Sequence, residues 1–286
     1  MESAKPAVLV LSRILAQVQR GEIQIPALPT VVAELRGLVS KSDSKLEAVV
    51  ALLERDPALV ARVLQLGRNA AFGRPGQVVD IPFIIQRVGF RQINDIVETV
   101  WANDCFRIAD ARYQPYAAMV SRHSLARAVA MRSLAEAQRL EPFSAYMAGL
   151  FADVGASFLL WAIVDKSRGR APEPEDAMAF IREHHESMSG AVLKRWGHSE
   201  AVIALVRRHH APALTPPASP YASLLVVASQ VAAELTREED LTAPAPWPGP
   251  VLLERCVSHA GLSEETLRAI TFRLRDEYAT ILSAVT

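Results

Sequence analysis

The stretch AYMAGLFADVGASFLLWAIV, residues 145–164, is the longest strongly apolar segment of the chain. A helix that crosses a bilayer needs about 20 such residues, so its length alone would allow a membrane span. Asp153 lies near its middle, and a charged side chain at the centre of a bilayer costs roughly 2.5–3.5 kcal/mol on insertion scales. The core of a large helical protein also requires helices that are apolar on every side. We therefore interpret residues 145–164 as one buried central helix and not as a membrane span.

The overall composition is that of an ordinary folded protein. The chain has 286 residues, of which 50% are hydrophobic and 22% charged, which suits one large domain or two small ones. Lysine plus arginine and aspartate plus glutamate each total 31, so no net charge attracts nucleic acid or an anionic membrane. The two cysteines, Cys105 and Cys256, form neither a disulfide framework nor a CxxC motif. With no export signal in residues 1–20, these features predict a cytoplasmic protein.

Signals for helices recur along the chain, whereas signals for strands and hairpins are scarce. The segment SDS, residues 42–44, has Glu47 three positions after its last serine, a capping-box spacing that predicts a helix beginning at Lys45. Asp56-Pro57 places a proline at another first helical position. Three further helices are predicted at residues 91–105, 221–236 and 263–283. Two proline-rich loops are predicted at residues 214–220 and 242–250. The sequence predicts an all-α protein with at least nine helices.

Five ionisable residues fall among the apolar positions of the predicted helices. His123, His185 and His209 each share a helical face with apolar residues three or four positions away, Asp153 lies inside the apolar segment, and His210 follows His209. Buried charge must be paired, hydrogen-bonded or bound to metal, and imidazole with carboxylate suits zinc, iron or manganese. A shared polar or metal pocket is one interpretation. The other is that each histidine is a core residue bonded to the backbone, since no HExxH motif is present.

The order of these residues resembles the histidine-aspartate (HD) phosphohydrolase superfamily, in which a His, a His-Asp dipeptide and a later Asp bind metal from successive helices. The sequence is most similar to its HDOD branch, the HD-related output domain of bacterial signalling proteins. The resemblance rests on His123-Ser124 and on the segments IPALP (25–29), DPALVARVLQLGRNAAFG (56–73), IIQRVGF (84–90), GLFADVG (149–155) and WGHSEAVIALVRRHH (196–210). It implies a multi-helix, HD-domain-like bundle.

Two positions depart from the metal-binding pattern of that superfamily. Ala152 stands where the dipeptide has His, and Ser229 stands where a later helix has Asp, while His123 and Asp153 are retained. Three further histidines, His185, His209 and His210, match positions that support additional metals in the related cyclic dinucleotide phosphodiesterases. Two remaining ligands do not ordinarily hold a catalytic ion with an open position for water. The resemblance therefore implies a vestigial pocket of His123, Asp153, His185, His209 and His210, with no catalytic residue, cofactor or bound metal.

The same resemblance suggests an organisation and a function. Residues 1–20 form an N-terminal helix, residues 21–237 the HDOD domain, and residues 238–286 a proline-rich loop with a helical extension. We expect a non-enzymatic bacterial signal-transduction module that binds a regulatory protein or a small signalling ligand. The alternative is a divergent metal-dependent phosphohydrolase, with a cyclic dinucleotide or nucleotide as substrate, in which the five residues hold an ion in a rearranged site.

We do not expect nucleic-acid binding. The arginines that could support it, Arg87, Arg91, Arg207 and Arg208, are typical of a solvated surface, and salt-sensitive binding to a nucleic acid would be needed to assign them that role. The sequence leaves the oligomeric state and the identity of the partner open.

Overall fold

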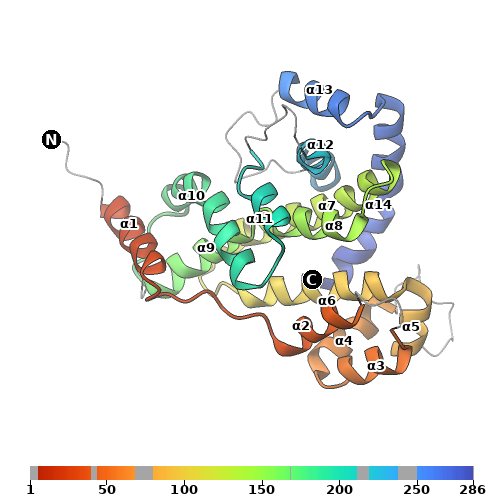
Figure 1. The fold of residues 1–286 in the computed structure, drawn as a ribbon. Helices are drawn as coiled ribbons and strands as arrows, with labels where there is room; N and C mark the ends of the chain where they lie inside the picture. The colour runs from red at the N-terminus through yellow and green to blue at the C-terminus, as the bar shows by residue number, and fades with distance from the viewer. Residues whose placement is uncertain are drawn as a thin grey trace. The chain divides into compact units, whose positions relative to one another are not determined.

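The computed structural model of the protein describes residues 6–39, 44–67, 80–167, 169–210, 219–237 and 250–285 (Figure 1). Over these residues the chain forms fourteen α-helices and no strand, which confirms the all-α prediction. The helices are α1 Pro6–Gln19, α2 Thr30–Val39, α3 Leu46–Leu53, α4 Pro57–Gly67, α5 Ile81–Val88, α6 Phe90–Cys105, α7 Gln114–Ala137, α8 Pro142–Phe151, α9 Val154–Lys166, α10 Pro174–Arg195, α11 Glu200–Val206, α12 Pro220–Thr236, α13 Pro250–His259 and α14 Glu264–Val285.

The chain divides into two compact units. The larger unit comprises Met1–Pro26 and Phe106–Leu274, and the smaller unit comprises Ala27–Cys105 and Arg275–Thr286. Helices α2 to α6 thus belong to the smaller unit, and α1 and α7 to α13 to the larger one. The domain boundaries expected at residues 20/21 and 237/238 stay predictions.

Local sequence rules account for several helix ends. The helix α4 begins at Pro57, directly after Asp56, whose carboxylate accepts a hydrogen bond from the Leu59 N–H at 3.3 Å. The Asp80 carboxylate accepts from the Phe83 N–H at 2.8 Å and caps α5. That helix ends at Gly89, whose φ of 88° lies in a region that glycine adopts without a Cβ clash.

The predicted capping box before α3 is wrong. This helix begins at Leu46 with Lys45 as its N-cap residue, which makes no side-chain capping bond. The Ser44 hydroxyl donates to the Leu38 carbonyl oxygen instead, so it is turned toward the preceding helix. The other two residues of the predicted start, Ser42 and Asp43, lie outside the described residues.

The other predicted helices are confirmed. The predictions at 91–105, 221–236 and 263–283 correspond to α6, α12 and α14. The predicted loops at 214–220 and 242–250 lie almost entirely outside the described residues, and their last prolines, Pro220 and Pro250, begin α12 and α13.

The core of the larger unit contains the apolar segment, as predicted, but not as one helix. The segment forms α8 and α9, separated by Ala152 and Asp153, so the prediction of a continuous helix over residues 145–164 is wrong. Ser144–Lys166 has the length and hydropathy of a membrane span, yet 83% of its apolar window is buried inside the protein. Helix α7 lies beside α8 and α12, and α9 lies beside α10 (Figure 1).

A side chain from α10 holds the break between α8 and α9. The Ser189 hydroxyl donates to the Ala152 carbonyl oxygen at 2.7 Å and accepts from the Gly155 N–H at 2.8 Å. Two backbone groups that the interruption takes out of the helical hydrogen-bond pattern are thereby satisfied. The break also turns Asp153 away from a helical position, and its buried carboxylate meets side chains from other helices.

Candidate functional site

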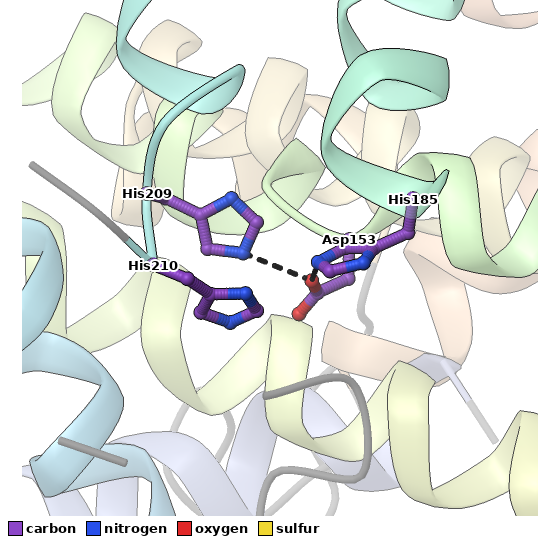
Figure 2. Close-up of side chains that lie close together, drawn as sticks. All are labelled: Asp153, His185, His209 and His210. Atoms are coloured by element: carbon purple, nitrogen blue, oxygen red, sulfur yellow. Dashed lines mark hydrogen bonds and ion pairs between the residues drawn. The ribbon is translucent and has the colours of Figure 1, made fainter. Parts of the chain in front are cut away.

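Four of the five predicted residues come together in the larger unit. One side-chain ligand atom from each of Asp153, His185, His209 and His210 lies within 4.8 Å of the other three (Figure 2). Asp153 comes from the α8–α9 break, His185 from α10, and the two adjacent histidines from the turn that follows α11. The first three are buried and His210 is half-buried. We call these four residues the histidine-aspartate centre.

The fifth predicted residue, His123, is not a member of this centre. It is buried on α7, but the group of converging ligand atoms does not include it. The two positions where the expected ligands are replaced are also buried. Ala152 offers no ligand atom, and the Ser229 hydroxyl on α12 donates to the Leu225 carbonyl oxygen at 3.0 Å.

Backbone carbonyl groups fix the orientation of two imidazole rings. Nδ1 of His185 lies 3.0 Å from the Ile181 oxygen, and Nδ1 of His209 lies 2.8 Å from the Val206 oxygen. A carbonyl oxygen only accepts, so each Nδ1 carries a proton and Nε2 is the nitrogen that faces the centre. The Nε2 atoms of His185 and His209 lie 3.5 Å and 3.2 Å from Oδ1 of Asp153 (Figure 2). Both rings are thus directed at the same carboxylate oxygen.

Burial determines the charge of His185, whereas two hydrogen bonds hold the ring of His209. Burial lowers the pKa of His185 to about 4, against an opposing attraction from Asp153, so this ring is neutral at pH 7. His209 makes a hydrogen bond to Asp153 through Nε2 as well as one to the backbone through Nδ1. Both nitrogens of His209 are therefore held by the protein, Nδ1 by the backbone and Nε2 by Asp153.

Glu186 links the turn after α11 to α10. Its Oε1 accepts from the backbone N–H of His210 at 2.8 Å and lies 3.5 Å from Nδ1 of His209. A carboxylate therefore faces His209 at each of its two nitrogens, Glu186 at Nδ1 and Asp153 at Nε2. Because its side chain is 28% exposed, Glu186 is more strongly hydrated than Asp153.

One further residue contacts the centre, Arg127, which the sequence analysis did not single out. Its side chain is fully buried, its Nη2 donates to Oδ2 of Asp153, and its Nε donates to the Gly149 carbonyl oxygen at 3.1 Å. A Cβ atom at Gly149 would lie 2.8 Å from the Ala128 Cα, so this glycine permits the close approach of α7 and α8. An arginine within an otherwise small and apolar part of a helix, four positions after His123, is the signal that could have pointed to it.

Three imidazoles and a carboxylate are the donor types that zinc, iron or manganese prefer. The charge of the centre does not match a divalent ion, however. Oδ2 of Asp153 is bound by the Arg127 guanidinium, so a cation of the protein already neutralises the only carboxylate of the centre. The centre offers the types of donor atom that a metal ion needs, but its charge does not suit a divalent ion.

An all-α fold in which α10 and the turn after α11 bring histidines to one buried aspartate is the arrangement expected of an HD-like domain. A family model for the HDOD domain matches residues 25–212, and the chain belongs to this family, a signalling-related branch of the HD-like domains. That match covers α2 to α11 and includes every residue of the histidine-aspartate centre.

Several solved structures share the fold. A protein from Shewanella amazonensis, provisionally named a metal-dependent phosphohydrolase, is 22% identical with a TM-score of 0.71, covering 98% of this chain and 99% of that one. An HDOD domain protein of unknown function from Geobacter sulfurreducens is 20% identical with a TM-score of 0.67, covering 97% and 98%. A Marinobacter aquaeolei protein, provisionally named for signal transduction, is 19% identical with a TM-score of 0.71, covering 96% and 65%. At these identities the similarity shows the fold alone.

An uncharacterized protein of Treponema pallidum is similar in sequence. It is 26% identical over an alignment of 200 positions, which covers 65% of this chain and 37% of that protein. The chain therefore spans little more than a third of the length of this relative.

Proposed function

We propose that this protein is a non-enzymatic signal-transduction module that acts by binding a regulatory protein or a small signalling ligand. The observation that carries the proposal is the state of Asp153. This carboxylate is 1% exposed and is bound by a buried arginine and a histidine of the same chain. A metal-dependent hydrolase needs an ion with an open position, on which water is activated next to the substrate. A buried and internally neutralised carboxylate does not favour that arrangement.

Two further observations support a binding role. Ala152 and Ser229 stand where the HD superfamily has a metal-binding imidazole and a metal-binding carboxylate, so two ligands of that pattern are replaced. The chain also belongs to the HDOD family, and the structural relative from Marinobacter aquaeolei carries a name that refers to signal transduction. These features support a protein that binds a partner and catalyses no reaction.

The second candidate is a divergent metal-dependent phosphohydrolase. The convergence of four ligand atoms within 4.8 Å favours it, as does the name of the structural relative from Shewanella amazonensis. Its substrate class would be a cyclic dinucleotide or a nucleotide.

An activity assay separates the two candidates. The full chain, purified without chelator, is incubated with Mn²⁺, Fe²⁺ or Zn²⁺ and with a cyclic dinucleotide, a nucleoside triphosphate or a nitrophenyl phosphodiester. We expect no hydrolysis above that of Asp153→Asn, which removes the charge of the carboxylate and keeps its shape. Hydrolysis by the wild type that is lost in Asp153→Asn would establish the phosphohydrolase and overturn the proposed function.

A further inference from the structure

Arg127 is the largest fully buried side chain of the described residues, and it pairs with Asp153 of the histidine-aspartate centre. Side-chain exposure is 0% for Arg127 and 1% for Asp153, so the ion pair is removed from water almost completely. A buried guanidinium is unfavourable unless it is paired and its N–H groups are bonded. Arg127 meets this requirement through Asp153 and through the Gly149 carbonyl oxygen.

The two oxygens of Asp153 have different partners. Oδ2 accepts from Arg127, while Oδ1 faces the Nε2 atoms of His209 at 3.2 Å and of His185 at 3.5 Å. The guanidinium therefore lies on one side of the carboxylate and the imidazoles lie on the other. A divalent ion held by Oδ1 and the histidines would share this carboxylate with a permanent positive charge.

We propose that Arg127 is a built-in cation that takes the electrostatic place of a metal ion at Asp153, so that the histidine-aspartate centre is complete without a metal and disfavours binding one. This role of Arg127 concerns the same centre as the proposed function, and it rests on that function only in expecting no hydrolysis by the wild type. The affinity of the centre for metal can be measured without any enzymatic activity.

The charges of the buried side chains explain why one residue has this effect. With Arg127 present, Asp153 and Arg127 sum to zero, and a divalent ion would add two uncompensated charges to a buried site. Without Arg127, a buried carboxylate beside three imidazoles offers one negative charge and four donor atoms that already lie within 4.8 Å of one another. Glu186 does not change this comparison, because its carboxylate lies near His209 both with and without Arg127.

The test is the variant Arg127→Met, which keeps a long side chain and removes the charge. Binding of Zn²⁺ and Mn²⁺ to the full chain is measured by competition with a chelator of known affinity, and the thermal midpoint is recorded with and without each ion. We expect Arg127→Met to bind one Zn²⁺ per chain at least 100-fold more tightly than the wild type. Zn²⁺ should raise the midpoint of the variant and leave that of the wild type unchanged.

Two control variants separate charge from packing. Arg127→Lys keeps a cation at the same place and should bind Zn²⁺ as weakly as the wild type. Arg127→Met combined with Asp153→Asn removes both charges, so it should fold without metal and gain no Zn²⁺ affinity. A gain in this double variant equal to that of Arg127→Met would show that the lost packing, and not the lost charge, opened the site, and would overturn the proposal.

The remaining outcomes also decide the question. Tight, stoichiometric Zn²⁺ binding by the wild type, equal to that of Arg127→Met, would overturn the proposal, as would a folded Arg127→Met that gains no affinity. If Arg127→Met does not fold without metal, folding on addition of Zn²⁺ supports the proposal. If Zn²⁺ does not fold Arg127→Met although the double variant is folded, the proposal is contradicted. Tight metal binding by the wild type without hydrolysis would leave the proposed function standing.

Discussion

Burial dominates the behaviour of the His185 imidazole. It lowers the pKa of this side chain to about 4, attraction to Asp153 acts against it, and repulsion from His209 and His210 adds to it. In the unfolded chain a histidine has a pKa of about 6.5. Between these two values the unfolded state binds the proton and the folded state does not. The stability that neutral His185 contributes is therefore fully present above about pH 6.5 and is lost as the pH falls toward 4.

The first prediction is an acid-dependent loss of stability that depends on His185. The free energy of unfolding in urea should fall between pH 7.5 and pH 4.5, and about 2–3 kcal/mol of that fall should disappear in His185→Gln, at about 1.4 kcal/mol per pKa unit. The adjacent His184 is partly exposed and serves as a control. His184→Gln should keep the pH dependence of the wild type. A His185→Gln variant that loses as much stability in acid as the wild type would contradict the assignment.

The individual residues of the centre could be predicted only in part. Helical periodicity identified Asp153, His185 and His209 because each lies among apolar positions of its own helix or segment. Arg127 could not be selected in this way. The arginines at 122, 127 and 132 are five residues apart and therefore point in different directions around α7, at about 100° per residue. The small apolar residues around Arg127 set it apart from the other two arginines, but its partner Asp153 is known only from the packing of other helices.

At the level of elements, the break between α8 and α9 shows what apolar periodicity cannot reveal. Residues on both sides of Asp153 are apolar, so the sequence pattern continues across it. The interruption is held by Ser189 of α10, which lies more than 30 positions later in the chain and bonds to Ala152 and Gly155. The helical class of this segment and its burial are local properties and were predictable, whereas its division into two helices is a property of tertiary contact.

A close approach of α9 and α10 places His185 next to Asp153. An added Cβ at Gly155 would lie 2.3 Å from the His185 carbonyl oxygen and 2.3 Å from the Ser189 nitrogen, and both are backbone atoms that cannot rotate away. Gly155→Ala should therefore lower the free energy of unfolding in urea by at least about 2–3 kcal/mol or prevent folding. It should also weaken the pH dependence assigned to His185, because the two helices must separate.

Gly37→Ala on α2 is the matched control for this substitution. Apart from its chain neighbours and the backbone of its own helix, no heavy atom lies within 4 Å of the Cβ position at Gly37, and its φ lies outside the positive range. Alanine is favoured over glycine in a helix by up to about 1 kcal/mol, so this variant should be as stable as the wild type or more stable. A Gly155→Ala variant that is as stable as Gly37→Ala would show that α9 and α10 do not approach as closely as described.

For the whole molecule, the helical class follows from the sequence, but the grouping of helices into units does not. Periodicity, caps and prolines are local signals, and they predicted helices that the structure contains at α4, α6, α12 and α14. The larger unit instead combines Met1–Pro26 with Phe106–Leu274, two segments separated by 79 intervening residues, Ala27–Cys105. Such a grouping depends on which apolar faces meet, and the sequence pattern of a single helix does not specify its partner.

Each unit has its own buried apolar contacts. In the larger unit, Phe158 is fully buried, with its ring centroid 5.8 Å from that of Phe106. In the smaller unit, Val97 on α6 is fully buried, and Glu98 beside it pairs with Arg36 of α2 at 2.8 Å. Because separate cores open with separate free energies, we expect the two units to differ in amide protection.

Hydrogen exchange of the full chain tests this expectation through one core substitution in each unit. Phe158→Ala should cost about 3–5 kcal/mol and lower amide protection mainly in α7, α9 and α10, whereas Val97→Ala should lower it mainly in α2 to α6. Phe272 on α14 is 74% exposed, so Phe272→Ala should change protection by less than about 0.5 kcal/mol. If Phe158→Ala and Val97→Ala each lowered protection equally in both units, the chain would unfold as one cooperative structure and the separation of the two cores would be wrong.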